Sequence, residues 1–287
     1  MRLIKPSVEI WEQPPGMSGI YQQIERCARV CYKSEDKIGE GTAEKMVRML
    51  EEREHTAMLE HGTVYLTIPK NETLAWEEYL YDTHARVNFD RAFAYVTTNY
   101  RTLYENDLLE DLQYQTEPME GHEKRVTVHF TCDRGISHEL VRHRVFSFAQ
   151  ESTRYCNYSK DKFGNELTFI IPGWLNLPER SYGTIDNPSD IQFKQYDDPY
   201  EAEFVNGLLG AEFRYMNLLG NQKEGNPWTP QQARTILPNS LKTEVCMTGF
   251  VSDWEYFFGL RTAQNAHPQM RELTIPLKDI FKNKGLL

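Results

Sequence analysis

The densest group of residues that could do chemistry lies between positions 142 and 154. This segment contains three arginines, a histidine and, near its end, two adjacent hydroxyl residues that could bind phosphate: Arg142, His143, Arg144, Ser152, Thr153 and Arg154. Arginine binds phosphate and carboxylate groups through paired N–H donors, and serine or threonine adds short hydrogen bonds. Because the whole chain carries a formal net charge of -10, this cationic cluster predicts a local site for a small polyanion.

A second interpretation of the cluster is purely structural. The apolar residues Ile136, Leu140, Val141 and Val145 follow the spacing of one helical face. The cationic residues at 142–144 would then close the last turn of that helix, where they interact favourably with the helix dipole. The residues alone leave both interpretations open.

Another arginine, Arg261, shares a predicted helical face with Trp254, Phe257 and Phe258. Such an arginine either extends past the aromatic rings to water or points into an aromatic pocket. Covalent catalysis has weaker support, because none of the five cysteines has a neighbouring base in the sequence that would activate it. Ser152 also lacks a nearby general base, so we do not expect it to act as a nucleophile.

Changes in hydrophobic period indicate the elements that position these residues. Residues 19–33 and 43–54 have the pattern of amphipathic helices, the second with Thr42 as its N-cap. Alternating apolar residues at 64–68 and 126–131 predict two half-buried strands. We expect these two strands to pair with each other in antiparallel fashion.

Two long segments interrupt this arrangement, and we interpret both as insertions. The first, 70–124, is predicted to be largely helical, and the second, 157–199, is rich in Gly, Pro, Asn and Asp and is predicted to be irregular. The other predicted elements are a strand at 168–171, a helix at 200–219, a strand at 241–249, and helices opened by capping boxes at 229–232 and 252–255.

Composition limits the class of protein. With 287 residues, 40% hydrophobic and 26% charged, the chain is typical of a soluble globular protein, and we predict one domain over residues 1–287. No apolar run predicts a signal peptide or a membrane span. The five cysteines lack C-x-x-C spacing, and Cys27 and Cys31 share a helical face with apolar residues, which predicts core thiols in a reducing cytoplasm. The acidic balance argues against nucleic-acid binding, and no metal site is expected.

The ordered motifs resemble the flavin-dependent thymidylate synthases. The signature of that family is R-H-R, seven residues and a serine, which is found here from Arg142 to Ser152 and continues with Arg154 and Tyr155. Upstream, the sequences ARVC at 28–31 and LEH at 59–61 are similar to the family, and downstream so are ARTILP at 233–238 and LR at 260–261. The resemblance covers about residues 20 to 275 and implies an α/β fold in which a sheet containing antiparallel strands is flanked by long helices.

The resemblance also implies an activity. The methylene group of 5,10-methylenetetrahydrofolate would be transferred to C5 of deoxyuridine monophosphate (dUMP), with bound FAD as the reductant and NADPH restoring the reduced flavin. The family implies a homotetramer whose active sites lie between subunits. A single catalytic domain of this kind would bind neither nucleic acid nor membrane.

Site residues follow from the resemblance, position by position. Arg261 is expected to be catalytic, because a fixed guanidinium stabilises negative charge on the pyrimidine ring. Residues expected near FAD are His61, Thr63, Arg142, His143, Arg144 and Gln150. Residues expected to bind dUMP are Glu139, Leu140, Val141, Arg142, Gln150, Glu151, Ser152, Thr153, Arg154, Arg234 and Arg261, partly through backbone amides at 150–154.

Several positions depart from the family pattern. Many members have glutamate in place of Gln150, and polar or charged residues where this chain has Phe250, Ser252 and Tyr256. These changes suggest that FAD is held differently, with aromatic stacking on Phe250 or Tyr256 as one hypothesis. They also keep open an alternative function, a nucleotide- or flavin-binding protein without turnover. The two insertions are candidates for a subunit interface or for a cover over the site.

Overall fold

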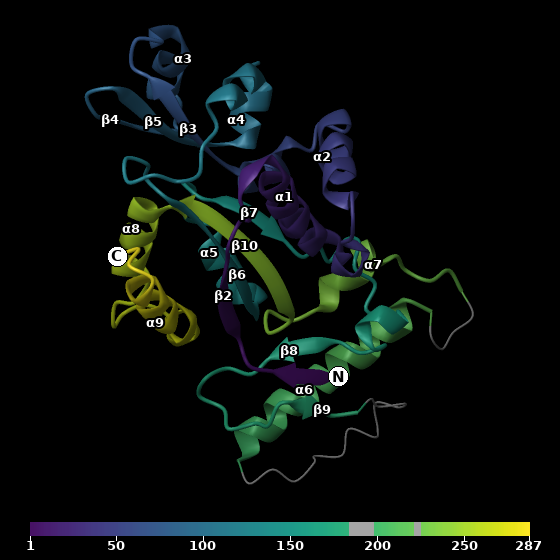
Figure 1. Cartoon of the computed structure of the whole chain (residues 1–287). Helices are drawn as coiled ribbons and strands as arrows, with labels where there is room; N and C mark the ends of the chain where they lie inside the picture. The colour runs from purple at the N-terminus through teal and green to yellow at the C-terminus, as the bar shows by residue number, and fades with distance from the viewer. Residues whose placement is uncertain (184–197, 221–224) are drawn as a thin grey trace.

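The structure is a computed structural model that describes residues 1–183, 198–220 and 225–287. Three sheets organise it, with strand orders β8-β1-β9, β2-β6-β10-β7 and β3-β5-β4 (Figure 1). The strands are β1 (Arg2–Ile4), β2 (Ser7–Trp11), β3 (Thr63–Pro69), β4 (Arg86–Phe89), β5 (Phe93–Asn99), β6 (Arg125–Asp133), β7 (Ser147–Gln150), β8 (Thr168–Ile170), β9 (Arg180–Ser181) and β10 (Lys242–Phe250). The helices are α1 (Gly16–Tyr32), α2 (Thr42–Glu52), α3 (Thr73–Glu77), α4 (Tyr100–Glu105), α5 (Arg134–Leu140), α6 (Pro199–Leu218), α7 (Pro230–Ala233), α8 (Val251–Arg261) and α9 (Pro268–Asn283).

The central sheet is entirely antiparallel, and its two faces carry different residues. On β10, Val245 and Met247 pack with α5, α8 and α9, whereas Cys246 on the opposite face packs with α1. Figure 1 shows α8 and α9 on one side of β6 and β10, with α1 on the other. The predicted mixed fold, with antiparallel strands flanked by helices, is therefore confirmed.

The predicted pairing of the strands at 64–68 and 126–131 is wrong. Both strands form, but β3 pairs with β5 in a separate sheet, while β6 lies between β2 and β10. The reason is a hairpin inside the segment 70–124, where β4 and β5 form next to β3. The prediction that this segment is largely helical is wrong for the same reason, since buried Ala94 and Val96 alternate with half-buried Tyr95.

The predicted second insertion contains the strand expected at 168–171, which forms as β8 and pairs in parallel with β1. Residues 184–197 of this insertion lie outside the described part of the chain. The helix predicted at 200–219 forms as α6 and packs on this sheet through Val205, Leu208 and Leu209.

The capping predictions have mixed outcomes. Thr229 and Gln232 form the predicted capping box at the start of α7. Thr42 is the first residue of α2 and not its N-cap, which is Gly41. The box predicted at 252–255 is also wrong, because α8 begins at Val251 and the Ser252 amide donates to the carboxylate of Glu123. None of the helices in the described ranges is long and apolar enough to cross a membrane.

Candidate active site

The residues 142–144 lie in a turn just after α5, not in its last turn as the helical interpretation predicted. The helix ends at Leu140, and the chain turns back through hydrogen bonds from His143 N to Leu140 O and from Phe146 N to His143 O. Buried Phe146 anchors the turn against Trp254, with ring centroids 4.7 Å apart. Gly249 permits this packing, because a Cβ there would lie 2.3 Å from the Phe146 ring.

Arg261 points into this turn. Its Nε donates to His143 Nε2 at 2.8 Å, its Nη1 donates to Glu139 Oε2 at 2.6 Å, and its Nη2 donates to the Glu139 carbonyl at 3.1 Å. Burial, followed by the charge of Arg261, lowers the pKa of His143 to about 4, so the imidazole is neutral near pH 7 and can accept this hydrogen bond. The guanidinium of Arg261 is therefore half-buried and held by Glu139 and His143, so it does not extend freely to water and its polar contacts are not those of a purely aromatic pocket.

Arg142 and Arg144 are exposed, and neither guanidinium has a hydrogen bond or ion pair within the described residues. Arg144 lines a cavity of about 170 Å³ together with Arg86, Arg125 and Phe250. Such exposed, unpaired guanidinium groups can bind a phosphate by donating hydrogen bonds to its oxygens. The residues at this end of the site therefore fit an anionic, phosphate-bearing cofactor.

Stacking of a flavin on Phe250 is not supported by the structure. Phe250 is buried, and the guanidinium groups of Arg86 and Arg125 lie 4.5 Å and 5.5 Å from its ring centroid. Tyr256 is 68% exposed and stays available for stacking.

The loop at 150–154 follows β7, and consecutive residues in it face opposite sides of the central sheet. The Nε2 of Gln150 donates to Ser137 Oγ on α5 at 2.9 Å. Glu151 is buried on the other side, where it accepts hydrogen bonds from Tyr158 at 2.9 Å and Lys242 at 2.8 Å. The Glu151 side chain therefore holds the loop in place and is not free to contact a ligand.

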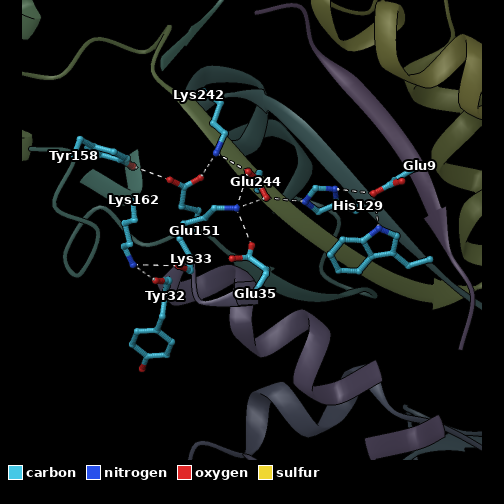
Figure 2. Close-up of polar contacts among 11 residues, drawn as sticks. Glu9, Tyr32, Lys33, Glu35, His129, Glu151, Tyr158, Lys162, Lys242 and Glu244 are labelled. Carbon is cyan, nitrogen blue, oxygen red and sulfur yellow. Dashed lines mark hydrogen bonds and ion pairs between the residues drawn. The ribbon is translucent and has the colours of Figure 1, made fainter. Parts of the chain in front are cut away.

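Figure 2 shows that Glu151 belongs to a larger ionic network. Lys242 Nζ lies 2.5 Å from Glu244 Oε1. The other oxygen of this carboxylate, Glu244 Oε2, contacts Lys33 and His129. Burial favours the neutral form of Glu244, but the hydrogen bond with His129 and the two ammonium groups outweigh it and hold the pKa of this carboxyl well below its usual range. The network thus joins β10, β6 and the C-terminal end of α1 to the loop.

Backbone amides in this loop are mostly engaged within the protein. The amide of Glu151 donates to Glu244 O, that of Ser152 to Cys31 O, and that of Arg154 to Ser152 Oγ. The Thr153 amide has no hydrogen-bond partner in the part of the chain that is described. Amide recognition of a ligand would therefore depend on Thr153.

Arg154 and Arg234 form a second arginine cluster beside this loop. Arg234 Nη1 donates to Thr153 Oγ1 at 3.4 Å, and Arg154 Nε donates to Gln231 Oε1 at 3.3 Å. Both guanidinium groups are exposed, and their contacts are with neutral oxygens, so their charges stay available for an anion. Ser152 has no hydrogen bond to a basic side chain among the described residues.

β7 separates the two arginine clusters, of which the first is Arg142 and Arg144 and the second is Arg154 and Arg234. Residues 142–144 precede this strand and residues 150–154 end it, and four residues of strand span roughly 13 Å. No hydrogen bond or ion pair joins Arg261 to Ser152, Arg154 or Arg234 in the described residues. Within the described residues, the two clusters therefore lie at opposite ends of β7 without a direct contact.

The remaining predicted residues are less accessible. The Leu140 side chain is buried in the core, while Val141 is exposed. His61 is fully buried, with Nδ1 2.8 Å from Thr248 Oγ1. Thr63 lines a cavity of about 470 Å³ that also contains Tyr65 and Arg125.

Cys27 lies near a possible base, His61, in the folded protein. Burial would raise the pKa of the Cys27 thiol, but the nearby Cys246 and His61 outweigh it and lower that pKa. Among the described residues, however, His61 Nδ1 is bonded to Thr248 and His61 Nε2 has no hydrogen-bond partner. These residues come from distant parts of the chain, so sequence spacing could not indicate that they lie together. Cys27 is nevertheless fully buried and lines none of the described cavities.

Sequence reasoning missed Lys33, Lys242 and Glu244, which hold the loop, and Arg86 and Arg125, which cover Phe250. A signal existed for two of them. Lys242 and Glu244 alternate on one face of a strand whose opposite face is apolar, and charged residues that share a strand face within a core are typically paired.

The fold and the site define an α/β protein with two arginine clusters suited to anionic ligands. Comparison with known proteins narrows this class, since the model of the thymidylate synthase complementing protein family matches residues 117–284. The chain belongs to this family, and the curated relatives that it matches are named flavin-dependent thymidylate synthases.

Three relatives show the extent of the similarity. The protein from Corynebacterium diphtheriae is 29% identical over 53% of this chain and 54% of its own length. That from Corynebacterium aurimucosum is 25% identical over 96% of this chain and 81% of its own length, and that from Pyrococcus horikoshii is 30% identical over 54% of each. The chain thus aligns with about half of two of these relatives and most of the third.

Two solved structures are similar at low identity. A UMP/dUMP methylase PolB from Streptomyces cacaoi, bound with 5-Br UMP, has a TM-score of 0.44 at 15% identity, over 99% of this chain and 92% of that one. Thymidylate Synthase X from Helicobacter pylori, with FAD and dUMP, has a TM-score of 0.39 at 15% identity, over 96% and 92%.

Proposed function

We propose that this protein is a flavin-dependent thymidylate synthase that converts dUMP to thymidylate, with 5,10-methylenetetrahydrofolate as the carbon donor and FAD and NADPH as the reductants. The observation that carries the proposal is the family match over residues 117–284. That segment contains every arginine of the two clusters.

Arg154 and Arg234 would bind the phosphate of dUMP, with the Thr153 amide and hydroxyl completing the cluster. Two exposed guanidinium groups supply the charge-assisted, bidentate contacts that a phosphate favours. Their contacts to Gln231 and Thr153 hold both arginines beside the loop, and the ionic network beneath it fixes the loop itself.

Arg261 would stabilise negative charge on the uracil ring. A guanidinium has five N–H donors, and three of those of Arg261 already contact Glu139 and His143. The other two are free to donate to a carbonyl oxygen or a deprotonated ring nitrogen. Because Glu139 and His143 fix the guanidinium before substrate binds, little reorganisation is needed during the reaction.

Arg142, His143 and Arg144 would hold FAD, with Gln150, His61 and Thr63 near it. When bound, reduced FAD supplies the hydride of the reaction. Exposed Arg142 and Arg144 fit its phosphate groups. His143 is neutral, so it would contact the flavin ring through a hydrogen bond and would not bind a phosphate by charge. Arg86 and Arg125 are additional cations at this end of the site.

The separation of the two arginine clusters supports an active site shared between subunits. If residues 142–144 and 261 of one protomer face residues 150–154 and 234 of another, the two parts meet without any change within a protomer. A homotetramer provides such interfaces. All five cysteines are free thiols, which supports a reducing, cytoplasmic setting.

The test uses the purified protein. The preparation should carry a flavin spectrum that NADPH bleaches, and it should form thymidylate from dUMP when methylenetetrahydrofolate is added. Protein that binds dUMP and flavin but forms no thymidylate would instead support the binding protein without turnover, which the changes at Phe250 and Ser252 favour.

A further inference from the structure

A large groove lies next to the substrate loop and has no role in the site described above. It has a volume of about 800 Å³, within the range typical of ligand sites, and is formed by α1, α2 and the 3-10 helix at Thr56–His61. Three half-buried methionines, Met46, Met49 and Met58, line it. We call it the methionine groove.

The charge of the groove is the reverse of that of the protein. Five cations and one carboxylate line it, namely Arg29, Lys37, Arg53, Arg101, Lys162 and Glu54, whereas the chain as a whole has a net charge of -10. Arg29 and Arg101 are paired with glutamates. The side chains of Lys37 and Arg53 have no hydrogen bond or ion pair within the described ranges.

The groove is continuous with the loop that would hold dUMP. The Ser152 amide donates to Cys31 O, and the rings of Tyr32 and Tyr155 lie 5.1 Å apart. Lys162 Nζ donates to Tyr32 O at 3.4 Å and to Lys33 O at 3.1 Å. A ligand in the groove would therefore lie beside the nucleotide and within reach of Lys37 and Arg53.

We propose that the methionine groove binds the p-aminobenzoyl-glutamate tail of the folate co-substrate. Thioether sulfurs pack favourably against an aromatic ring, and the unpaired cations match the carboxylates of a glutamate tail. Tyr32 and Tyr155 mark the end of the groove beside this loop, from which the carbon-bearing ring would extend toward the nucleotide. This assignment rests on the proposed function, which requires the carbon donor to reach the nucleotide.

The experiment measures binding of 5-formyltetrahydrofolate, as the mono- and triglutamate, to the flavin-loaded protein saturated with dUMP. Arg53→Ala is expected to weaken triglutamate binding about three- to fivefold, as loss of one exposed ion pair predicts. Met49→Glu is expected to weaken both forms by about tenfold or more, since it places a like charge in the groove. Arg48→Ala is the matched control, because Arg48 is an exposed residue of α2 that does not line the groove.

Folding, flavin content and dUMP affinity should be unchanged in all three variants, and in turnover the KM for folate should rise while kcat is kept. Triglutamate affinity equal to wild type in Arg53→Ala and Met49→Glu, or no binding of the probe to wild type, would overturn the assignment. A variant that loses only its binding of FAD or dUMP would also overturn the assignment, because the groove would then bind that ligand. Failure of the proposed function is a separate result, in which wild type binds the probe and forms no thymidylate.

Discussion

Replacing Lys242 by methionine should lower the free energy of unfolding, and the contacts of Lys242 in the ionic network determine by how much. Lys242 Nζ lies 2.8 Å from Glu151 Oε2 and 2.5 Å from Glu244 Oε1, and the side chains of Lys242, Glu151 and Glu244 are 14%, 1% and 12% exposed. Glu244 keeps Lys33 and His129 in the variant, but among the described residues the Glu151 side chain keeps only the hydroxyl of Tyr158. The cost therefore falls on Glu151, whose carboxylate is left buried without a cation.

Breaking a buried ion pair from one side typically costs about 3–5 kcal/mol. Here the cost has a ceiling, because Glu151 can take up a proton instead, which costs about 3–4 kcal/mol at pH 7 for a glutamate of ordinary pKa. We expect a loss of about 3 kcal/mol in the free energy of unfolding at pH 7. Because a buried carboxylate that has lost its cation takes up a proton more easily at lower pH, this deficit should shrink to about 1 kcal/mol at pH 5.

Urea unfolding followed by circular dichroism at both pH values measures the deficit. The double variant Lys242→Met with Glu151→Gln should recover most of the loss, and Lys282→Met, on the exposed end of α9, should be neutral. A deficit below about 1 kcal/mol at pH 7, or one that grows toward pH 5, would refute the reasoning. Because Lys242 holds the loop and contacts no substrate, we also expect the KM for dUMP to rise.

Further predictions concern the site itself. Arg261→Ala should lower kcat for thymidylate formation by about 10³-fold or more, as loss of preorganised donors predicts, and wild-type turnover would remove Arg261 from its role. Ser152→Ala should keep measurable activity; complete loss with intact dUMP binding would revive the nucleophile hypothesis. Because His143 has a lowered pKa, its share of stability, at most about 3 kcal/mol and less given its partial exposure, should be lost as pH falls from about 6.5 to about 4. In urea unfolding, His143→Gln should lose less stability than wild type over that range, and parallel curves would contradict this. Inactive Arg142→Ala and Arg234→Ala proteins, mixed under conditions of subunit exchange, should regain activity if sites are shared, whereas continued inactivity would favour a site within one protomer.

What the sequence predicted well depends on local chemistry. The capping box at Thr229 and Gln232 formed because its hydrogen bonds join residues three positions apart. The pairing of β3 failed because two half-buried strands of similar pattern do not specify which partner each takes, and the nearby hairpin β4–β5 provided a closer one.

The same limit applies to the site. The cationic residues at 142–154 were recognisable from type and spacing, and they stay predictions in their roles toward dUMP and FAD. The contacts of Arg261 with Glu139 and His143 join residues more than a hundred positions apart, and so do those of Lys33 with Glu244. Sequence spacing carries no information on such pairs until the fold is known.

Gln150 shows how a departure from the family pattern can be matched by its surroundings. The Ser137 hydroxyl donates to the Arg134 carbonyl at 2.9 Å, so its oxygen can only accept from residue 150. The Gln150 amide supplies that donor and also reaches Thr243 Oγ1 at 3.2 Å, whereas a carboxylate would face the Ser137 lone pairs with no proton to share. The glutamine is therefore held in place by α5 and β10, on the sheet face of Arg261. The next residue, Glu151, is fixed on the other face, so the two-residue period of β7 ties both arginine clusters to one short strand.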